Sequence, residues 1–225
     1  MGWSVLSPIL MLFVMKVVFT QFFGRNTPHY TTYLFCGNLV WNYFRESTSG
    51  GMSSLMANKG IITKVNIPKY MFLLSKNVSS LINFALTLCV FFIFAAIDEI
   101  PFSFRMITLL YPIALLVIYN IGCGLILSAL FVFFRDISYL YDILTMLQMY
   151  MSAIFYRIDS YPIEIQKLFY LNPVYCFIEY FRTVVIDGMI PSVSLHAMCA
   201  GYALLFLAIG SLVYKKNNQK FLYYM

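Results

Sequence analysis

Six long apolar stretches constrain this chain more than any other feature. They lie near residues 4–23, 30–50, 71–97, 106–134, 137–156 and 193–214. A bilayer-spanning helix needs about 20 mostly apolar residues, because its backbone groups find no water to bond in the hydrocarbon. The chain is also 61% hydrophobic and 11% charged, beyond the apolar share of roughly 45–50% in soluble domains. The sequence therefore predicts an all-α polytopic membrane protein, with six transmembrane helices in one transmembrane domain over residues 1–225.

The basic residues orient these stretches. Three lysines and no acid lie between the second and third stretches, and three more lysines follow the sixth. The segment after the third stretch and the segment 157–191 are weaker in basic residues or richer in acidic ones. Short loops rich in lysine and arginine stay in the cytoplasm. We therefore expect both termini to be cytoplasmic and residues 157–191 to lie outside.

Arg135 and Asp136 interrupt the apolar sequence between the fourth and fifth stretches. One interpretation is that they only end two helices, since a cation suits a helix C-terminus and an anion suits the next N-terminus. The other is that they contact a cytoplasmic partner. With the orientation above, the pair lies in a tight turn at the cytoplasmic membrane surface.

The segment 157–191 is too apolar for a solvated loop and too interrupted for a clean span. Pro162 and Pro173 suit the first turns of helices, and Gly188 suits a helix end. These positions predict two short re-entrant helices dipping into the outer leaflet. Glu179 and Arg182 are three residues apart, so they share a helix face, on which they either line a pathway or form a local ion pair.

The segment 57–70 combines lysines with exposed-looking aliphatic residues. Ile61, Ile62 and Val65 lie beside Lys59 and Lys64. A solvated loop would not carry so many aliphatic side chains, whereas an amphipathic segment could dock them into a groove of a partner. The alternative is a segment that lies among the lipid headgroups with its lysines on anionic lipid.

Motifs for catalysis are missing from the sequence. It contains no Gly-rich phosphate loop, no HExxH and no G-x-S-x-G. The five cysteines are scattered singly, far from His29 and His196, so neither a metal site nor a cofactor is expected in this chain. The net charge of +6 comes largely from the cytoplasmic segments, which favours anionic headgroups rather than nucleic acid as its partner.

An ordered set of short motifs covers nearly the whole chain. They are Gly2-Trp3 with Pro8, "GNLVWNYF" at 37–44, "NKGIITKVNIPK" at 58–69, "FFRDI" at 133–137, "SAIFY" at 152–156 and "LNPVYCFIEYFRTVVIDG" at 171–188. This set resembles the permease subunit of bacterial polysaccharide ABC exporters, the group that exports O-antigen, teichoic acid and capsular chains. In that family an amphipathic helix usually precedes the Gly-Trp motif, whereas the printed sequence begins at it.

The resemblance implies a homodimer in the bacterial inner membrane. A separate cytoplasmic ATPase subunit, which binds ATP and Mg, would drive a lipid-linked glycan outward through a channel between the protomers. The resemblance also implies that residues 58–68 form a helix that couples to the ATPase, and that the second span faces the channel.

Three groups of candidate residues follow from these arguments. Coupling to the ATPase is expected at Asn58, Lys59, Ile61, Ile62, Lys64, Val65, Pro68, Arg135 and Asp136. The substrate pathway is expected at Tyr30, Tyr33, Trp41, Tyr43 and Phe44. An outer gate is expected at Asn172, Pro173, Tyr175, Glu179 and Arg182.

Two other functions remain open at this point. One is a permease of the same fold that exports a drug or a small lipid. The other, from a different class, is a membrane enzyme or scaffold that works without an ATPase.

Overall fold

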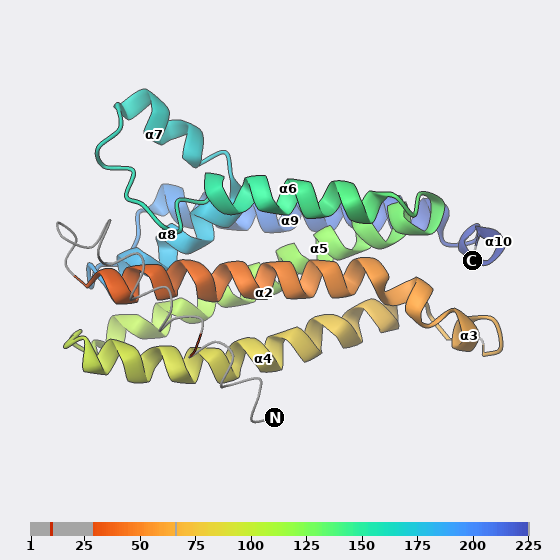
Figure 1. The fold of residues 1–225 in the computed structure, drawn as a ribbon, viewed down its shortest axis with the longest axis horizontal. Helices are drawn as coiled ribbons and strands as arrows, with labels where there is room; N and C mark the ends of the chain where they lie inside the picture. The colour runs from red at the N-terminus through yellow and green to blue at the C-terminus, as the bar shows by residue number, and fades with distance from the viewer. Residues whose placement is uncertain (1–9, 11–28, 66, 225) are drawn as a thin grey trace.

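Helices are the regular secondary structure of the described part of the chain. A computed structural model describes residues 10, 29–65 and 67–224, and within them no strand is formed. The helices are α2 (Tyr30–Ala57), α3 (Lys59–Ile62), α4 (Tyr70–Ile97), the 3-10 helix η2 (Phe104–Leu109), α5 (Leu110–Phe133), α6 (Ile137–Met151), α7 (Ile163–Phe169), α8 (Pro173–Val185), α9 (Val193–Asn217) and α10 (Phe221–Tyr224). The long helices run side by side along the longest axis (Figure 1). The first expected span, 4–23, lies outside the described residues apart from Leu10.

Three helical segments in the described residues are long and apolar enough to cross a membrane. They are Tyr70–Ile97, Phe104–Phe133 and Val193–Asn217, close to the expected spans 71–97, 106–134 and 193–214. Most of the apolar window of Tyr70–Ile97 and of Val193–Asn217 faces away from the bundle, whereas more than half of that of Phe104–Phe133 is buried inside it. The described residues therefore form an all-α bundle with three candidate membrane-spanning helices.

Helix α2 is the central helix of the bundle and differs from these three. It continues to Ala57, seven residues beyond the expected end at 50, through a polar sequence. The hydroxyl of Thr48 donates to the Phe44 carbonyl, and that of Ser54 donates to the Gly51 carbonyl. Because α4, α5 and α8 pack around α2, these polar side chains are covered by protein rather than by lipid.

Two glycines allow α5 and α9 to pack with their backbones in contact. A Cβ atom on Gly122 would lie 2.5 Å from the backbone nitrogen of Leu207, and one on Gly210 would meet the Gly122 carbonyl oxygen. Neither position has room for a side chain. Small residues serve this purpose in membrane helices, where close van der Waals packing holds helices together.

The bundle has two distinct ends (Figure 1). At one end lie α3, α10 and the turn between α5 and α6; Phe133 packs on Phe221, with 5.9 Å between the ring centres. At the other end lie α8 and the connection between α4 and η2, where the Arg105 guanidinium donates to the Gly188 carbonyl. The predicted coupling segment and the turn containing Arg135 therefore share one end.

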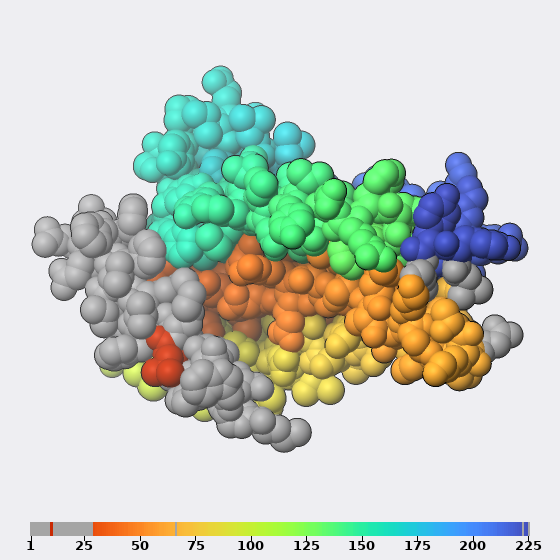
Figure 2. Space-filling view, turned by 45° about the vertical axis from the view of Figure 1, so that its right-hand side comes forward, coloured from red at the N-terminus to blue at the C-terminus, as the bar shows by residue number. Residues whose placement is uncertain are grey.

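Helix α6 lies on the outside of the bundle. Figure 2 shows it at the surface above α2, and the Tyr141 and Thr48 hydroxyls form a hydrogen bond between the two helices. Its outer face is apolar and exposed, at Tyr139, Leu140, Ile143, Leu144, Met146, Leu147, Tyr150 and Met151. This face needs lipid or protein to cover it.

Candidate functional site

Four successive carbonyl groups after α6 are bound by tyrosine and arginine side chains. Helix α6 ends at Met151, five residues before the expected end of the fifth span at 156. The Tyr30 hydroxyl donates to the Phe155 carbonyl over 2.8 Å. The Tyr33 hydroxyl donates to the Tyr156 carbonyl over 2.7 Å and to the Ala153 carbonyl over 3.3 Å. Non-helical backbone is tolerated in an apolar environment only when its polar groups find such partners.

Arg182 of α8 binds the same stretch. It is buried, with 4% of its surface exposed, and its Nη2 donates to the carbonyls of Ala153 and Ile154 over 3.0 and 3.2 Å. Its guanidinium carbon lies 3.5 Å from the centre of the Tyr33 ring, a cation–π contact. We call Tyr30, Tyr33, Arg182 and the carbonyls of 153–156 the arginine clamp.

Ala153 adopts a backbone conformation that L-residues rarely take. Its φ is 48° and its side chain is fully buried. A left-handed conformation costs an alanine about 1–2 kcal/mol, so it persists where other interactions hold it. Here the Ala153 carbonyl accepts from both Tyr33 and Arg182. The clamp thus holds the turn that redirects the chain from α6 toward the segment 157–191.

Gly37 makes room for the clamp on α2. A Cβ atom at this position would lie 3.0 Å from Cγ2 of Ile154 and 3.1 Å from Nη2 of Arg182. Both distances are tighter than ordinary van der Waals contact. The absent side chain lets the arginine reach the carbonyls beside α2.

Asn172 attaches the start of α8 to the end of α6. Its Oδ1 accepts from the backbone N–H of Val174, which caps the helix, and its Nδ2 donates to the Ser152 hydroxyl over 2.9 Å. Pro173 occupies the first turn of α8, as its fixed φ favours. Gly188 follows the helix with φ 62°. The two short helices α7 and α8 thus begin after Pro162 and Asn172 and end before Gly188, close to where the prolines and glycine predicted.

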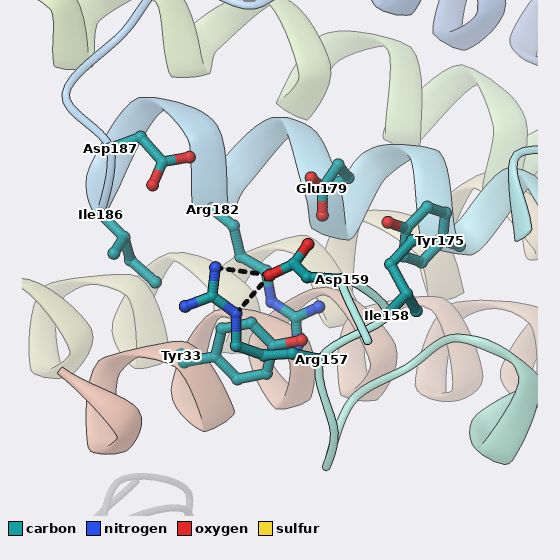
Figure 3. Close-up of a pocket in the computed structure, with 9 residues that line it drawn as sticks. All are labelled: Tyr33, Arg157, Ile158, Asp159, Tyr175, Glu179, Arg182, Ile186 and Asp187. Atoms are coloured by element: carbon teal, nitrogen blue, oxygen red, sulfur yellow. Dashed lines mark hydrogen bonds and ion pairs between the residues drawn. The ribbon is translucent and has the colours of Figure 1, made fainter. Parts of the chain in front are cut away.

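A small charged cavity lies beside the clamp (Figure 3). Its volume is about 60 Å³, room for a few water molecules. Residues of α2, α8 and the segment after α6 line it: Tyr33, Arg157, Ile158, Asp159, Tyr175, Glu179, Arg182, Ile186 and Asp187. The Tyr175 hydroxyl and the Arg182 Nε are buried without a hydrogen-bond partner among the described residues. The cavity is therefore a polar site at the α8 end of an apolar bundle.

The charges in the cavity pair differently from what the sequence spacing suggested. Among the residues that line this cavity, Arg157 pairs with Asp159 at 2.7 Å. Arg182 is directed at the carbonyls of the clamp instead of at Glu179. Glu179 and Arg182 share one face of α8 and line the same cavity. The ion pair that their spacing of three residues allowed does not form.

Two carboxyl groups of this cavity have perturbed protonation. Burial raises the pKa of Glu179, and the nearby Arg182 cation opposes that shift. Burial also raises the pKa of Asp187, opposed by Arg157. Desolvation disfavours the charged form of a carboxyl group. Both groups therefore hold a proton more readily than an exposed carboxyl would.

The predicted coupling segment divides into buried and exposed parts. Ile62 is buried, with 6% of its surface exposed, in a cluster that includes Leu55 and Phe221. Ile61 and Val65 are 48% and 49% exposed. The lysines at 59 and 64 and the proline at 68 are exposed as well, while Asn58 ends α2 and donates from Nδ2 to the Ser54 carbonyl. One isoleucine anchors the segment, and an aliphatic residue on each side of it remains free for a partner.

Arg135 and Asp136 lie in the exposed turn between α5 and α6. Asp136 directly precedes α6, but its side chain makes no capping hydrogen bond. The two residues lie at a junction between helices, as the sequence predicted. The aspartate does not stabilise the start of α6 by a capping hydrogen bond. Because this turn shares an end with α3, contact of both with one partner stays a prediction.

The five aromatic residues predicted for a substrate pathway are all buried within the protomer. Their exposed fractions are 5% for Tyr30, 8% for Tyr33, 3% for Trp41, 2% for Tyr43 and 4% for Phe44. Tyr30 and Tyr33 belong to the clamp. The other three are part of the packed core, and their role in a pathway stays a prediction.

No local pattern in the sequence marks Gly37, Ala153 or Ile154 as parts of one site. Gly37 begins the quoted stretch "GNLVWNYF", and the alanine and isoleucine lie in "SAIFY". Those two stretches are more than 100 residues apart, and only the fold brings them together. One feature that the two stretches share in the sequence is a small residue within a long apolar segment.

Comparisons with known proteins give a consistent result. Residues 1–186 match the family described as "ABC-2 type transporter". The chain is 24% identical over 224 residues to the "O-antigen export system permease protein RfbA" of Myxococcus xanthus, covering 97% of this chain and 85% of that protein. It is 28% identical over 187 residues to a protein of the same name from Klebsiella pneumoniae, covering 83% of this chain and 72% of that protein.

Proposed function

Because this chain belongs to the ABC-2 type transporter family, we propose that it is the membrane subunit of an ATP-driven exporter of a lipid-linked polysaccharide. The observation that carries the proposal is the similarity to O-antigen export permeases over 97% of the chain. Those relatives are transport subunits, so we assign this chain no catalytic role. ATP and Mg would be bound by a partner ATPase, and nucleic acid plays no part.

The proposed topology has six membrane spans in the bacterial inner membrane, with both termini cytoplasmic. The positions of α3, the α5–α6 turn and α10 at one end of the bundle support it (Figure 1), because Lys59, Lys64, Arg135 and Lys220 lie in or next to these segments. Helices α7 and α8 would then lie at the outer surface and enter the outer leaflet. Helix α6, with 15 residues, extends about 22 Å at 1.5 Å per residue and would complete its crossing through the clamped stretch.

We propose that the ATPase contacts the α3 end. The exposed side chains of Ile61 and Val65 support this, since a partner surface would bury two aliphatic residues that are flanked by lysines. Arg135 and Asp136, in the neighbouring exposed turn, would contribute charge to the same contact. Binding at this end would place the nucleotide-driven movement next to the ends of α2, α4 and α5.

The pathway for the glycan would lie between two copies of the chain. Support comes from the interior of the described bundle, which is filled by large side chains such as Tyr43, Trp41 and Phe44. A sugar chain needs more room than the 60 Å³ of the charged cavity. A second copy facing the first would provide a route without unpacking the core of either.

Helix α8 and the arginine clamp would form the outer gate. A single buried arginine joins α8, the end of α6 and α2, so a shift of α8 would move all three together. Charges at this depth are costly and usually functional. The aromatic clamp residues Tyr30 and Tyr33 would thus act in the gate as well as beside the pathway.

Deleting the gene in its host tests the proposal. Loss of this permease should remove the surface polysaccharide while lipid-linked glycan accumulates inside the cell. A plasmid copy of the full chain should restore export, and the same copy should fail when the partner ATPase cannot hydrolyse ATP. An unchanged surface glycan, together with loss of resistance to a drug, would favour the small-molecule exporter instead.

A further inference from the structure

An apolar groove opens on the surface between α4, α5 and α9, toward the end that carries α3 and α10. Its volume is about 460 Å³. Leu73 and Leu74 of α4 form one wall, and Ile121 and Leu125 of α5 form the floor. Tyr214 of α9 contributes to the opposite wall. The groove belongs neither to the clamp nor to the coupling segment.

The mouth of the groove is positively charged. Lys215 lines it, and Lys216 is exposed next in sequence. Nearby, the Lys69 ammonium donates to the Asn218 carbonyl and lies 5.7 Å from the centre of the Phe221 ring. No aspartate or glutamate occurs in residues 59–76 or 211–224, so no acid from these segments neutralises the mouth.

A second observation points to a ligand in the groove. Tyr214 has 6% of its surface exposed, and its hydroxyl is buried without a hydrogen-bond partner among the described residues. A buried hydroxyl without a partner is costly. The hydroxyl is closed off from the open groove in this conformation, so an acceptor oxygen of a ligand would remove that cost once the tyrosine ring turns toward the groove.

We propose that this groove binds one anionic glycerophospholipid of the surrounding bilayer. An acyl chain lies along the leucine and isoleucine side chains, and the phosphate of the headgroup binds the Lys215 ammonium. The Tyr214 hydroxyl donates to an ester or phosphate oxygen of the same lipid. The bound lipid fills the space between α4 and α9 and adds to the Lys69–Asn218 hydrogen bond that joins their ends.

Charge and shape together favour this occupant. Free phosphate would leave the apolar walls uncovered, and a zwitterionic lipid would bring a second cation to a mouth that is already positive. Anionic lipids are attracted to clusters of lysine at a membrane surface. The groove is a site for a bilayer lipid, separate from the exported cargo.

The test uses the full chain purified in detergent and stripped of lipid. Phosphatidylglycerol or phosphatidylcholine with identical acyl chains is added, and binding is followed by native mass spectrometry and by the melting temperature. We expect one tightly bound phosphatidylglycerol and a larger rise in melting temperature than with phosphatidylcholine, because a ligand that binds only the folded state stabilises it.

Three variants make the test specific. Lys215→Gln should weaken phosphatidylglycerol binding about fivefold, the effect of one lysine beside an anionic headgroup. Ser211→Trp should abolish binding by filling the groove without changing charge. Lys167→Gln, a matched loss of charge on α7 at the opposite end, should bind like the wild type.

Several outcomes would overturn the proposal. Equal stabilisation by both lipids would show that the headgroup is not recognised. Unchanged phosphatidylglycerol binding by Lys215→Gln would contradict the contact between the phosphate and this lysine. A rise in melting temperature with glycerol phosphate as large as that with phosphatidylglycerol would contradict the binding of the acyl chain. Displacement of the bound lipid by an equal concentration of a polyprenyl phosphate would assign the groove to cargo instead.

Discussion

The guanidinium carbon of Arg182 lies 3.5 Å from the centre of the Tyr33 ring. This contact stacks a buried cation of α8 on an aromatic residue of α2, while the same cation binds two carbonyls at the end of α6. Three segments of the chain thus depend on one side chain. Its removal should affect both the fold and the proposed gate.

Arg182→Met should destabilise the protein by about 3 kcal/mol or more, because two hydrogen bonds from a charged donor are lost and the Ile154 carbonyl is left without its side-chain partner. Tyr33→Phe keeps the ring and removes only the hydroxyl, so it should cost about 1–3 kcal/mol. Thermal unfolding in detergent measures both. If the arginine variant melted like the wild type, the carbonyl contacts would contribute nothing to holding these segments.

Gly37→Ala should disturb the clamp although it adds a single methyl group. The new Cβ would lie 3.0 Å from Ile154 and 3.1 Å from the Arg182 guanidinium, so one of them must move. Gly201→Ala is the matched control, since nothing lies within 4 Å of its Cβ position in α9. The control should be neutral or stabilising by up to about 1 kcal/mol, as alanine favours helices. Similar melting temperatures for both variants would contradict the packing around Arg182.

The coupling segment should respond differently at neighbouring positions. Ile61→Asp and Val65→Asp change exposed side chains, so they should leave the melting temperature nearly unchanged and reduce co-purification of the ATPase. Ile62→Asp places a charge in a packed cluster, so it should destabilise the protein itself.

Lys59→Ala serves as the control for the coupling variants, because an exposed charge is worth about 1 kcal/mol or less. It should retain most of the ATPase. Full retention of the ATPase by Ile61→Asp and Val65→Asp would remove the coupling assignment from this segment.

Glu179 should make stability depend on pH. Because its pKa is raised in the folded state, the folded protein binds a proton more readily than the unfolded chain, whose glutamate titrates near pH 4.3. The extra stability is complete below that pH and is lost as the pH rises through the raised folded value.

Melting temperatures measured from pH 4 to 8 check this dependence. Glu179→Gln should make the fall of melting temperature with rising pH less steep. The part of the fall that remains belongs to Asp187, whose pKa is also raised. Glu164→Gln, an exposed change on α7, should leave the wild-type decline in place. A decline equally steep in Glu179→Gln would contradict the effect of its burial.

The sequence predicted helix boundaries best for the segments whose length and apolar composition suit a bilayer. The boundaries of α4 and the start of α9 were expected within one residue, because apolar length determines how a segment crosses a bilayer. The extension of α2 to Ala57 was not expected, because neighbouring helices rather than lipid cover its polar second half. The composition of a segment does not show which neighbouring helices will bury its polar side chains.

The end of α6 and the partners of Arg182 depend on contacts distant in the sequence. Tyr33 binds a carbonyl 120 residues away, and Arg182 binds one 29 residues away. Helical spacing indicates which residues share a face, as it did for Glu179 and Arg182, but not which distant backbone group comes within reach. The same holds for Ile62, whose burial depends on Phe221.

The most direct test of the proposed function is transport by the reconstituted complex. The permease and its ATPase are placed in proteoliposomes that carry a lipid-linked glycan in the leaflet facing the ATPase, and glycan in the opposite leaflet is measured with and without ATP. We expect ATP-dependent appearance of glycan, reduced in Arg182→Met per folded complex and normal in Gly201→Ala. Glycan that fails to cross with ATP in an assembled wild-type complex, or crosses equally without it, would contradict the proposed function.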